Sequence, residues 1–289
     1  MNEKSIRLLD CTLRDGGHLT QGVFGEKMIR SVIKRLVDSR VDIVEVGFLW
    51  ESVTSDDTAR FTSIADVKRF LPDDKKDSVF SLMADFVDLD KLEPCDGTVE
   101  IIRLSFKRQR LEWALSTARK LMAKGYKCFI NPVNCNVYTD EEYIEVLKKV
   151  NELKPYGFSI VDTFGVLRKR DLSRLYEIVE SQLDPDITIG LHLHENLGLA
   201  YSLAQHFLEI HILRPLILEI RRPTRQIVVD GSLLGMGREP GNLCMEQIMD
   251  HLNAEYGSAY HVEPALDAID DYIAPLKNEY GWGYAVPYM

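Results

Sequence analysis

Short runs of aliphatic, β-branched and aromatic residues recur along the chain, and each is followed by a longer stretch that mixes polar and apolar residues. Runs of this length and composition are typical of buried β-strands, whose two faces are both covered by other parts of a protein. The sequence predicts eight such strands, at residues 6–13, 41–48, 78–86, 98–106, 127–135, 157–164, 187–194 and 226–233.

Helices are predicted between these strands, over residues 26–39, 109–124, 140–153 and 169–182. Within the first helix, the apolar residues from Met28 to Val37 recur at the three- and four-residue spacing of one helical face. Thr139 stands directly before the third helix, and Glu142 follows three positions later. This pair has the pattern of a capping box, which predicts a helix N-terminus at that point.

The alternation of eight strands with helices over about 255 residues predicts a single-domain α/β fold, a closed (β/α)8 TIM barrel. An open doubly wound sheet shows the same alternation. It normally carries a glycine-rich phosphate loop, and no GxGxxG or Walker sequence follows these strands. No linker-like composition divides the chain, so we expect one catalytic domain over residues 1–256. Residues 257–289 are expected to form a short helical and aromatic C-terminal tail that packs on the barrel or on a partner.

Composition and charge narrow the classes of function. The 289 residues are 45% hydrophobic and 28% charged, which suits a globular protein with a large core. A net charge of -10 without a basic block argues against nucleic-acid and anionic-membrane partners. The opening residues lack a signal-peptide core, and no apolar run reaches the roughly 18 residues of a membrane span. Five cysteines without a CxxC pair predict free thiols, so we expect a cytoplasmic protein.

Ionisable residues gather where the predicted strands end. In a TIM barrel, the loops at the carboxyl ends of the strands form the active site. The segment 10–18, with the sequence DCTLRDGGH, follows the first strand, and Glu45, Asp162 and Asp230 stand at the ends of three others. Independent surface loops would not place charged residues at so many strand ends. We therefore expect these residues to share one site.

The strongest local signal is the pair His192 and His194. Residues two apart on a strand point to the same face, so both imidazole rings can reach one ion. Asp15 should face them, because only the eighth strand separates the first strand from the seventh in a barrel. Imidazole suits Zn²⁺, Mn²⁺, Fe²⁺ or Co²⁺, and an added carboxylate shifts the preference toward Mn²⁺ or Mg²⁺. The alternative is a buried histidine pair that makes hydrogen bonds only.

Four motifs in order, DCTLRDGGH, VEVGF, GLHLHENLGLA and DGSLLGMGREPGN, resemble a family of metal-dependent carbon–carbon lyases and synthases on a barrel fold. The family includes hydroxymethylglutaryl-CoA lyase, isopropylmalate synthase and 4-hydroxy-2-oxovalerate aldolase. The resemblance implies a bound divalent metal, with Mn²⁺ or Mg²⁺ expected and Co²⁺ or Zn²⁺ as alternatives. It also implies which residues surround that metal: Asp15, His192, His194 and Asn242.

Within this family, the resemblance is greatest to the 4-hydroxy-2-oxo acid aldolases, which carry a histidine where this chain has His18. It implies cleavage of a small 2-oxo acid substrate to pyruvate and an aldehyde through a pyruvate enolate. Because that enolate is too basic to form unaided at neutral pH, it needs a Lewis acid and a fixed cation, and Arg14 would be the cation. A histidine titrates near neutral pH, so His18 is the predicted base for the C4 hydroxyl.

Five further candidate residues each allow a functional and a structural interpretation. Glu45 either orients the arginine or a ligand water of the site, or it is a structural ion-pair partner. Asp162 and Thr163 resemble a substrate-binding position, but an aspartate there also suits a cap of the next helix. Gly235 and Gly237 are expected to form backbone turns near the substrate carboxylate.

The same residues allow other functions and partners to be considered or excluded. Amidohydrolase barrels also use an HxH pair but carry it on the first strand, which argues against them. A Claisen-type acyl-CoA synthase or lyase of the same family stays open, as does a non-catalytic metal-binding barrel. Related aldolases often dock an aldehyde dehydrogenase through a C-terminal extension, and a tail of about thirty residues looks short for that partner. The tail offers Tyr284 and Tyr288 as candidate catalytic tyrosines, and the state of homo-oligomerisation stays open.

Overall fold

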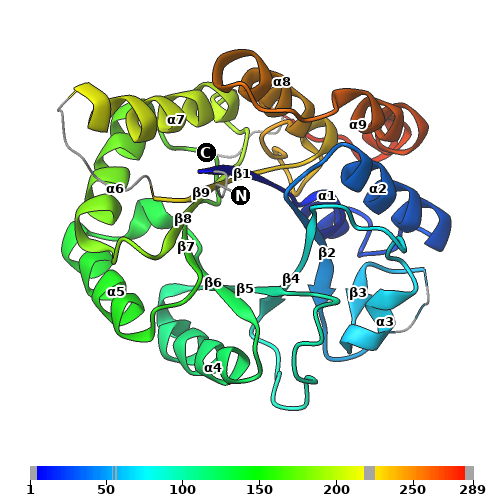
Figure 1. Ribbon diagram of the computed structural model, residues 1–289, viewed down its shortest axis with the longest axis horizontal. Helices are drawn as coiled ribbons and strands as arrows, with labels where there is room; N and C mark the ends of the chain where they lie inside the picture. Colours follow the sequence, from blue (N-terminus) through cyan, green and yellow to red (C-terminus); the bar gives the residue numbers. More distant parts are fainter. Residues whose placement is uncertain (1–4, 54, 56, 218–224, 284–289) are drawn as a thin grey trace.

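Eight parallel strands close into a barrel in this computed structural model, which describes residues 5–53, 55, 57–217 and 225–283 (Figure 1). The hydrogen-bonded order is β1-β9-β8-β7-β6-β5-β4-β2, and pairing of β1 with β2 completes the ring. A two-residue strand, β3, pairs with the end of β2 outside the ring. The strands are β1 (Ile6–Asp10), β2 (Ile43–Leu49), β3 (Arg60–Phe61), β4 (Val79–Asp85), β5 (Ile101–Phe106), β6 (Lys127–Pro132), β7 (Gly157–Asp162), β8 (Thr188–Leu193) and β9 (Ile227–Gly231).

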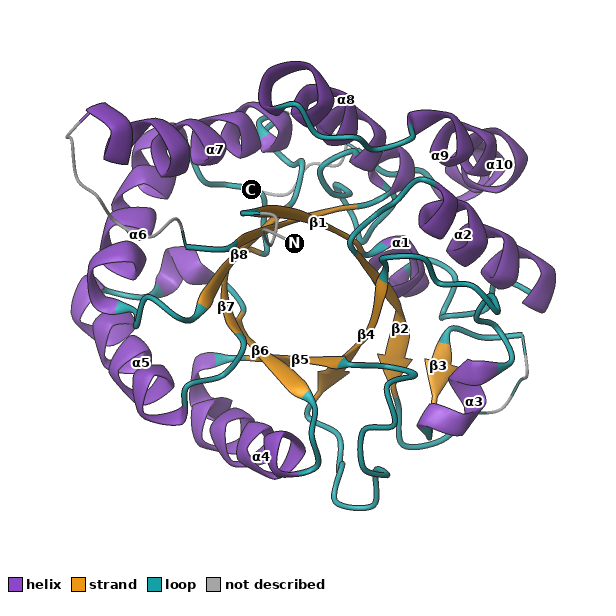
Figure 2. Ribbon diagram, in the orientation of Figure 1, coloured by secondary structure: helices purple, strands orange, loops and turns teal. Residues whose placement is uncertain are grey.

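Helices surround the barrel on its outside (Figure 2). The α-helices are α1 (Thr12–Asp15), α2 (Glu26–Asp38), α3 (Ile64–Lys68), α4 (Leu111–Ala123), α5 (Asp140–Leu153), α6 (Lys169–Gln182), α7 (Ala200–Ile217), α8 (Met245–Tyr256), α9 (Val262–Ala268) and α10 (Ala274–Tyr280). Shorter 3-10 turns are η1 (Gly16–His18), η2 (Arg108–Arg110), η3 (Cys135–Val137) and η4 (Leu233–Gly235), and η5 (Ile269–Ile273) is π-helical.

The predicted elements are confirmed at most positions. All eight predicted strands form, and α5 and α6 begin and end at the predicted residues. The hydroxyl of Thr139 accepts a hydrogen bond from the Glu142 backbone N–H (3.2 Å), and the Glu142 carboxylate accepts one from the Thr139 N–H (3.0 Å). This reciprocal pair is the predicted capping box, and it satisfies two N–H groups that a helix N-terminus leaves without partners.

The prediction of a helix after every strand is wrong between β4 and β5. Residues 86–100, all of which the structure describes, contain no helix. The side chains of Asp88 and Asp96 each accept a hydrogen bond from the backbone N–H two residues later, and Pro94 lies between these turns. Such local turns compete with the hydrogen bonds of a helix, and proline lacks the N–H that a helix interior requires. A further difference is β3, which was not predicted.

The inside of the barrel has an apolar floor with a polar layer above it. The floor is a separate buried cluster of Leu9, Cys11, Ile43, Ile101, Phe129 and Val228. Side chains two positions apart on a strand point to the same face. Two positions beyond floor residues of β2, β5 and β9 stand Glu45, Arg103 and Asp230, all of them buried. The carboxyl-terminal half of the barrel interior is therefore lined with charged groups.

The C-terminal helices lie against the outside of the barrel helices, with α9 beside α2 (Figure 1). Arg35 of α2 donates hydrogen bonds to a carbonyl of α9 and to a carboxylate of the following π-helical turn, both at 2.5 Å. The indole N–H of Trp282 donates to the carbonyl of Leu234 (2.9 Å). These contacts tie the tail to the rest of the chain. The candidate tyrosines Tyr284 and Tyr288 lie outside the described residues.

All five cysteines lie in the described part of the chain, and none of them forms a disulfide. Burial raises the pKa of the thiols of Cys128 and Cys244 to about 12, so both stay protonated at neutral pH. Among the described residues, no helix combines the length and the apolar character needed to cross a membrane.

Candidate metal centre

Two consecutive helical turns after β1 carry Arg14, Asp15 and His18. Asp10 ends β1, and its carboxylate accepts hydrogen bonds from the backbone N–H and the hydroxyl of Thr12, each at 2.9 Å. These bonds fix the start of α1, and η1 follows it without a break. The segment 10–18, which the sequence analysis places in a loop after the first strand, is therefore largely helical. It brings three ionisable side chains to the carboxyl end of the barrel.

The side chains of Asp15, His192 and His194 converge on one point. The Nε2 atoms of the two histidines lie 3.3 Å apart, and Asp15 Oδ2 lies 3.9 Å from His194 Nε2. The three ligand atoms all lie within 4.8 Å of one another, and all three residues are buried. Around one first-row divalent ion, with bonds of about 2.1 Å, ligand atoms are about 3–4 Å apart. The three residues therefore fit a single ion.

The protonation states of this cluster are those that bind metals. Burial lowers the pKa of His194 to about 4, so its ring is neutral at neutral pH. Burial also opposes ionisation of Asp15, but the charge of Arg14 and the nearby histidines hold the pKa of that carboxyl well below its usual range. Neutral imidazole and ionised carboxylate are the forms with lone pairs available to a metal.

Asn242 supplies a further oxygen beside this cluster. Its Nδ2 donates hydrogen bonds to Asp15 Oδ2 (2.6 Å) and to the carbonyl of Met236 (3.1 Å). Its Oδ1 is buried and has no hydrogen-bond partner among the described residues. Two imidazole nitrogens, one carboxylate oxygen and a free amide oxygen together suit a divalent ion such as Mn²⁺, Mg²⁺, Co²⁺ or Zn²⁺. The arrangement indicates a divalent metal site without deciding which ion it prefers.

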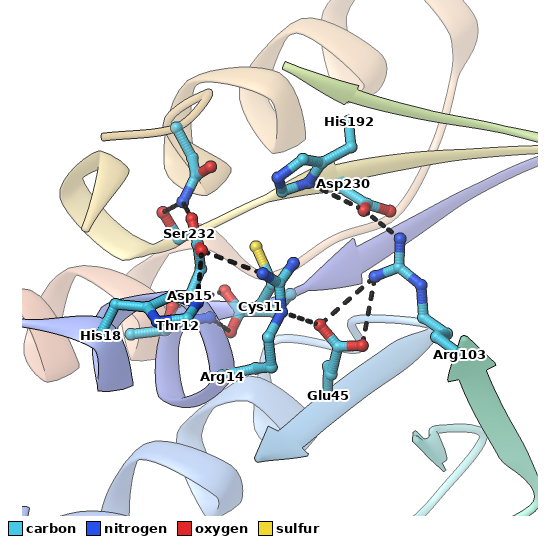
Figure 3. Close-up of polar contacts among 12 residues, drawn as sticks. Cys11, Thr12, Arg14, Asp15, His18, Glu45, Arg103, His192, Asp230 and Ser232 are labelled. Atoms are coloured by element: carbon cyan, nitrogen blue, oxygen red, sulfur yellow. Dashed lines mark hydrogen bonds and ion pairs between the residues drawn. The ribbon is translucent and has the colours of Figure 1, made fainter. Parts of the chain in front are cut away.

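Each side of the cluster is held by a buried carboxylate. On one side, His192 Nδ1 lies 3.0 Å from Asp230 Oδ2, and Arg103 pairs with the same oxygen (Figure 3). That carboxylate oxygen can only accept hydrogen bonds, so His192 Nδ1 carries the proton of this contact. The Nε2 atom of a neutral His192 then keeps its lone pair, which points toward His194.

On the other side, Glu45 binds the arginine of the site. Arg14 Nε donates to Glu45 Oε2 at 2.6 Å, and Arg14 Nη1 donates to Asp15 Oδ1 at 2.9 Å (Figure 3). Glu45 is fully buried, and Arg103 Nη1 lies 3.3 Å from both of its oxygens. Glu45 thus forms ion pairs with both Arg14 and Arg103, an arrangement that agrees with either interpretation.

His18 lies at the open side of the cluster. Its Nε2 atom is 3.8 Å from Asp15 Oδ1, and its ring packs edge-on against Phe48, with centroids 5.2 Å apart. The side chain keeps 38% of its exposure, whereas Asp15 and Arg14 are nearly inaccessible. Burial lowers the pKa of His18, and the negative charge of Asp15 only partly offsets this effect. The ring is therefore neutral and accessible at neutral pH.

The glycines of the β9 loop allow a close approach to the cluster. A side chain at Gly237 would place its Cβ 2.1 Å from Asn242 Nδ2 and 2.6 Å from Asp15 Oδ2. Gly235 has a φ of +64°, and a Cβ there would lie 2.8 Å from the carbonyl of Asn242. Only glycine fits these two positions. Both are thus adjacent to the predicted metal site.

Asp162 and Thr163 lie at the end of β7, where they bind the backbone. The two oxygens of Asp162 accept hydrogen bonds from the N–H groups of Val166 (3.1 Å) and Leu167 (3.0 Å). The Thr163 hydroxyl accepts one from the Asn134 N–H (2.8 Å). Asp162 thus binds the backbone of the loop before α6, but it does not cap that helix, whose N-cap residue is Arg168.

The sequence analysis missed Arg103, which connects the two sides of the site. An arginine in the middle of the apolar run IIRLSF was the signal available, because an isolated charge on a buried strand requires a partner. The identity of its partners was not available from the sequence, since Glu45 and Asp230 come from strands far away in the chain.

Comparisons with known proteins bear on this site. No family model matches the chain. The chain is 26% identical to a probable 2-isopropylmalate synthase of Methanosarcina acetivorans, over 89% of this chain and 48% of that protein. It is 22% identical to a 4-hydroxy-2-oxovalerate aldolase of Moorella thermoacetica, over 96% of this chain and 79% of that protein. The chain thus spans about half the length of the synthase.

A solved structure shows the same fold. Hydroxymethylglutaryl-CoA lyase from Pseudomonas aeruginosa superposes with a TM-score of 0.71 over 98% of this chain and 96% of that one, at 16% identity. The matching relatives, the barrel and the buried Asp-His-His cluster agree with one another. These findings show that the chain is similar to the DRE-TIM metallolyase family of TIM barrels, to which hydroxymethylglutaryl-CoA lyases and isopropylmalate synthases belong, with 4-hydroxy-2-oxovalerate aldolases as distant relatives of this chain.

Proposed function

We propose that this protein is a divalent-metal-dependent aldolase that cleaves, or in reverse forms, a 4-hydroxy-2-oxo acid, with pyruvate and an aldehyde as the products. The observation that carries this proposal is the position of His18. A neutral, accessible imidazole lies 3.8 Å from the carboxylate of Asp15, on the same helical segment as Arg14. Enolate chemistry with proton transfer needs a metal ligand, a fixed cation and a base, and this segment offers all three.

The metal would be held by Asp15, His192 and His194, with the free oxygen of Asn242 beside it. We propose Mn²⁺ or Mg²⁺, because a carboxylate and an amide oxygen accompany the imidazoles. When bound, the ion would supply Lewis-acid polarisation of the 2-oxo group of the substrate.

The charge of the buried network supports a 2-oxo acid as the ligand. Two guanidinium groups and three carboxylates are linked by ion pairs, which gives one net negative charge (Arg14, Arg103, Asp15, Glu45, Asp230). A divalent ion and one substrate carboxylate would bring this total to zero. Balanced charge matters here, because an uncompensated buried charge is costly.

Arg14 would stabilise the enolate oxygen. Its Nε and Nη1 atoms are bonded to Glu45 and Asp15, which fixes the plane of the guanidinium. Within the described part of the chain, its Nη2 group has no hydrogen-bond partner, so two N–H bonds remain for a substrate oxygen. A pre-oriented donor is effective where negative charge develops in a transition state, because no reorganisation is needed at that moment.

His18 would accept the proton of the C4 hydroxyl as the bond between C3 and C4 breaks. The lowered pKa keeps its ring neutral at neutral pH, which is the form that accepts a proton. In the reverse direction, the protonated ring would return this proton to the aldehyde oxygen. The partial exposure of His18 supports this role, because the aldehyde product would have to leave toward solvent.

Two activities separate the roles of Arg14 and His18. Exchange of pyruvate methyl protons with deuterated water requires formation of the enolate only. Cleavage requires the enolate and also removal of the proton from the C4 hydroxyl. We expect Arg14→Ala to lower both activities by about a hundred- to a thousandfold, as for loss of an oxyanion donor. We expect His18→Ala to lower cleavage by about a hundred- to ten-thousandfold, as for loss of a general base, while exchange is largely retained. Proton NMR measures exchange, and coupled pyruvate detection measures cleavage.

A control variant is His206→Ala. This histidine lies on α7, where its Nε2 is 2.7 Å from the Ser173 hydroxyl, away from the cluster, so both activities should stay unchanged. Equal loss of exchange and cleavage in His18→Ala would contradict the division of roles. Absence of cleavage for every 4-hydroxy-2-oxo acid tested with the unmodified, metal-loaded protein would contradict the aldolase itself.

A second candidate is a Claisen-type condensation of an acyl-CoA with a 2-oxo acid. It is supported by the similarity to an isopropylmalate synthase at 26% identity. The two reactions share the metal and Arg14, but the condensation forms an enolate of the acyl-CoA rather than of pyruvate. Release of free CoA thiol from acetyl-CoA in the presence of a 2-oxo acid, without pyruvate proton exchange, would favour this candidate over the aldolase.

A further inference from the structure

Arg103 is a buried cation that touches both sides of the site. It projects from β5 into the barrel with 2% of its side chain exposed. Its Nη2 pairs with Asp230 Oδ2, and its Nη1 lies 3.3 Å from both oxygens of Glu45 (Figure 3). The two carboxylates belong to β9 and β2, which lie on either side of β1 in the ring. Arg103 itself comes from β5, which lies opposite β9 in the ring and is separated from β2 by β4.

Burial of this guanidinium is expensive, and its two carboxylates compensate the cost. Removing a charge from water costs several kcal/mol unless the geometry and the hydrogen bonds of its partners are good. An arginine is suited to this place, because its planar group presents donors in two directions, whereas a lysine presents one compact charge. The fold therefore uses the fork of Arg103 to bind two buried acidic groups from different strands with a single cation.

Each of these carboxylates orients a different part of the site. Asp230 accepts from His192 Nδ1, which sets the tautomer and the direction of this predicted metal ligand. Glu45 accepts from Arg14 Nε, which sets the plane of the guanidinium that would face the substrate. Among the described side chains, only Arg103 forms hydrogen bonds or ion pairs with both carboxylates. A change at Arg103 is thus transmitted to the metal ligands and to Arg14 at the same time.

We propose that Arg103 is a positioning residue that couples the metal-binding half of the site to its enolate-stabilising half. Among the described residues, its hydrogen bonds and ion pairs go to Glu45 and Asp230 and not to the predicted metal ligands. It acts through Asp230 on His192 and through Glu45 on Arg14. The second arm rests on the proposed aldolase function, whereas the first arm requires only that the cluster binds a divalent ion.

The experiment compares three substitutions by two readouts. The readouts are the Kd for Mn²⁺, measured by titration calorimetry without substrate, and the rate of pyruvate proton exchange at saturating Mn²⁺. We expect Asp230→Asn to weaken Mn²⁺ binding about ten- to a hundredfold, as for loss of an outer-shell partner, with a smaller effect on exchange. We expect Glu45→Gln mainly to slow exchange. Arg103→Met should do both, by at least about tenfold in each readout.

Coupling is tested by combining Asp230→Asn with Glu45→Gln. If Arg103 links the two carboxylates, the change in Kd of the double variant should differ by at least about threefold from the product of the two single changes. Such a deviation is typical of residues in one network. In an Arg103→Lys background, where one ammonium cannot span both partners, that deviation should disappear. Arg103→Lys keeps the buried positive charge, so this cycle remains measurable even if Arg103→Met does not fold.

A second buried arginine, Arg225, is the control for a purely structural role of Arg103. Arg225 pairs with Glu180 (3.0 Å) and donates to three backbone carbonyls, and it is 7% exposed. Arg225→Met should lower the melting temperature as Arg103→Met does, but leave the Kd for Mn²⁺ unchanged. Unchanged Mn²⁺ affinity in both Arg103 variants would overturn the proposal, as would multiplicative effects in the wild-type background. If Mn²⁺ binding responds as expected while pyruvate exchange is absent from the unmodified protein, the aldolase proposal fails and the metal arm of this inference stands.

Discussion

The contact between Asn242 and Asp15 illustrates how single residues hold this site together. The amide donates to Asp15 Oδ2 at 2.6 Å, which leaves the other carboxylate oxygen to Arg14 and keeps Asp15 in one orientation. Gly237 lies against this bond so closely that a Cβ there would be 2.1 Å from the amide nitrogen, too close for both atoms to fit. The absence of a side chain at Gly237 therefore allows Asn242 to hold the predicted metal ligand Asp15 in place.

We therefore expect Gly237→Ala to weaken Mn²⁺ binding by about ten- to a hundredfold, because the new Cβ must displace Asn242 or Asp15. Gly17→Ala is the matched control. Gly17 lies between Asp15 and His18, yet a Cβ there would meet its nearest neighbour at an ordinary 3.6 Å. Titration calorimetry with Mn²⁺ measures both variants. Equal affinity of the two would show that the Gly237 loop yields without disturbing the cluster.

At the scale of elements, helices whose ends carry capping residues form where the sequence predicts them. The helix α5 begins at a capping box and packs its apolar face on the barrel, with Tyr143, Leu147 and Val150 buried. The segment between β4 and β5 has acidic turns instead of such a cap, and no helix forms there. The element boundaries follow the hydrogen bonds that each local sequence makes available to the backbone.

Thr139→Ala should destabilise the protein by about 1 kcal/mol, because the Glu142 N–H loses its acceptor at the start of α5. Thr139→Ser keeps the hydroxyl and should restore most of that loss. Urea unfolding monitored by circular dichroism measures the difference. Since α5 lies outside the barrel and away from the cluster, Mn²⁺ affinity should be the same in both variants, and a change in affinity would contradict this separation.

At the scale of the whole molecule, the predicted ion joins segments that are distant in sequence. Asp15 belongs to the turn after β1, whereas His192 and His194 belong to the end of β8. An ion that binds these residues only in the folded barrel must stabilise the barrel by mass action. The metal site and the closure of the ring are therefore linked thermodynamically.

With free Mn²⁺ at a hundred times its Kd, the stabilisation is about 2.7 kcal/mol, which corresponds to a rise in melting temperature of roughly 5–10 °C. Removal of the ion with EDTA should reverse this rise. His194→Gln should abolish it, and this variant leaves the buried charge unchanged because His194 is already neutral at neutral pH. Differential scanning calorimetry measures the shift, and a full shift in His194→Gln would exclude this residue as a ligand.

The sequence was informative about the site to the extent that the site is local. The same-face geometry of His192 and His194 follows from the period of a strand, and Arg14, Asp15 and His18 are neighbours in the chain. For Asp162, the sequence alone left two roles open, because the choice depends on whether its oxygens meet a substrate or the N–H groups of the following loop. In the structure these oxygens meet the loop.

The eight strands, most of their helices and the histidine pair were determined by the sequence itself, because strand and helix periods and caps depend on residues within a few positions of each other. Only the tertiary structure decided that Arg103 meets Glu45 and Asp230. These three residues come from β5, β2 and β9, and their distances depend on how the ring closes. Charges from opposite walls interact strongly there because the closed barrel excludes water, and no short segment of the chain encodes that enclosure.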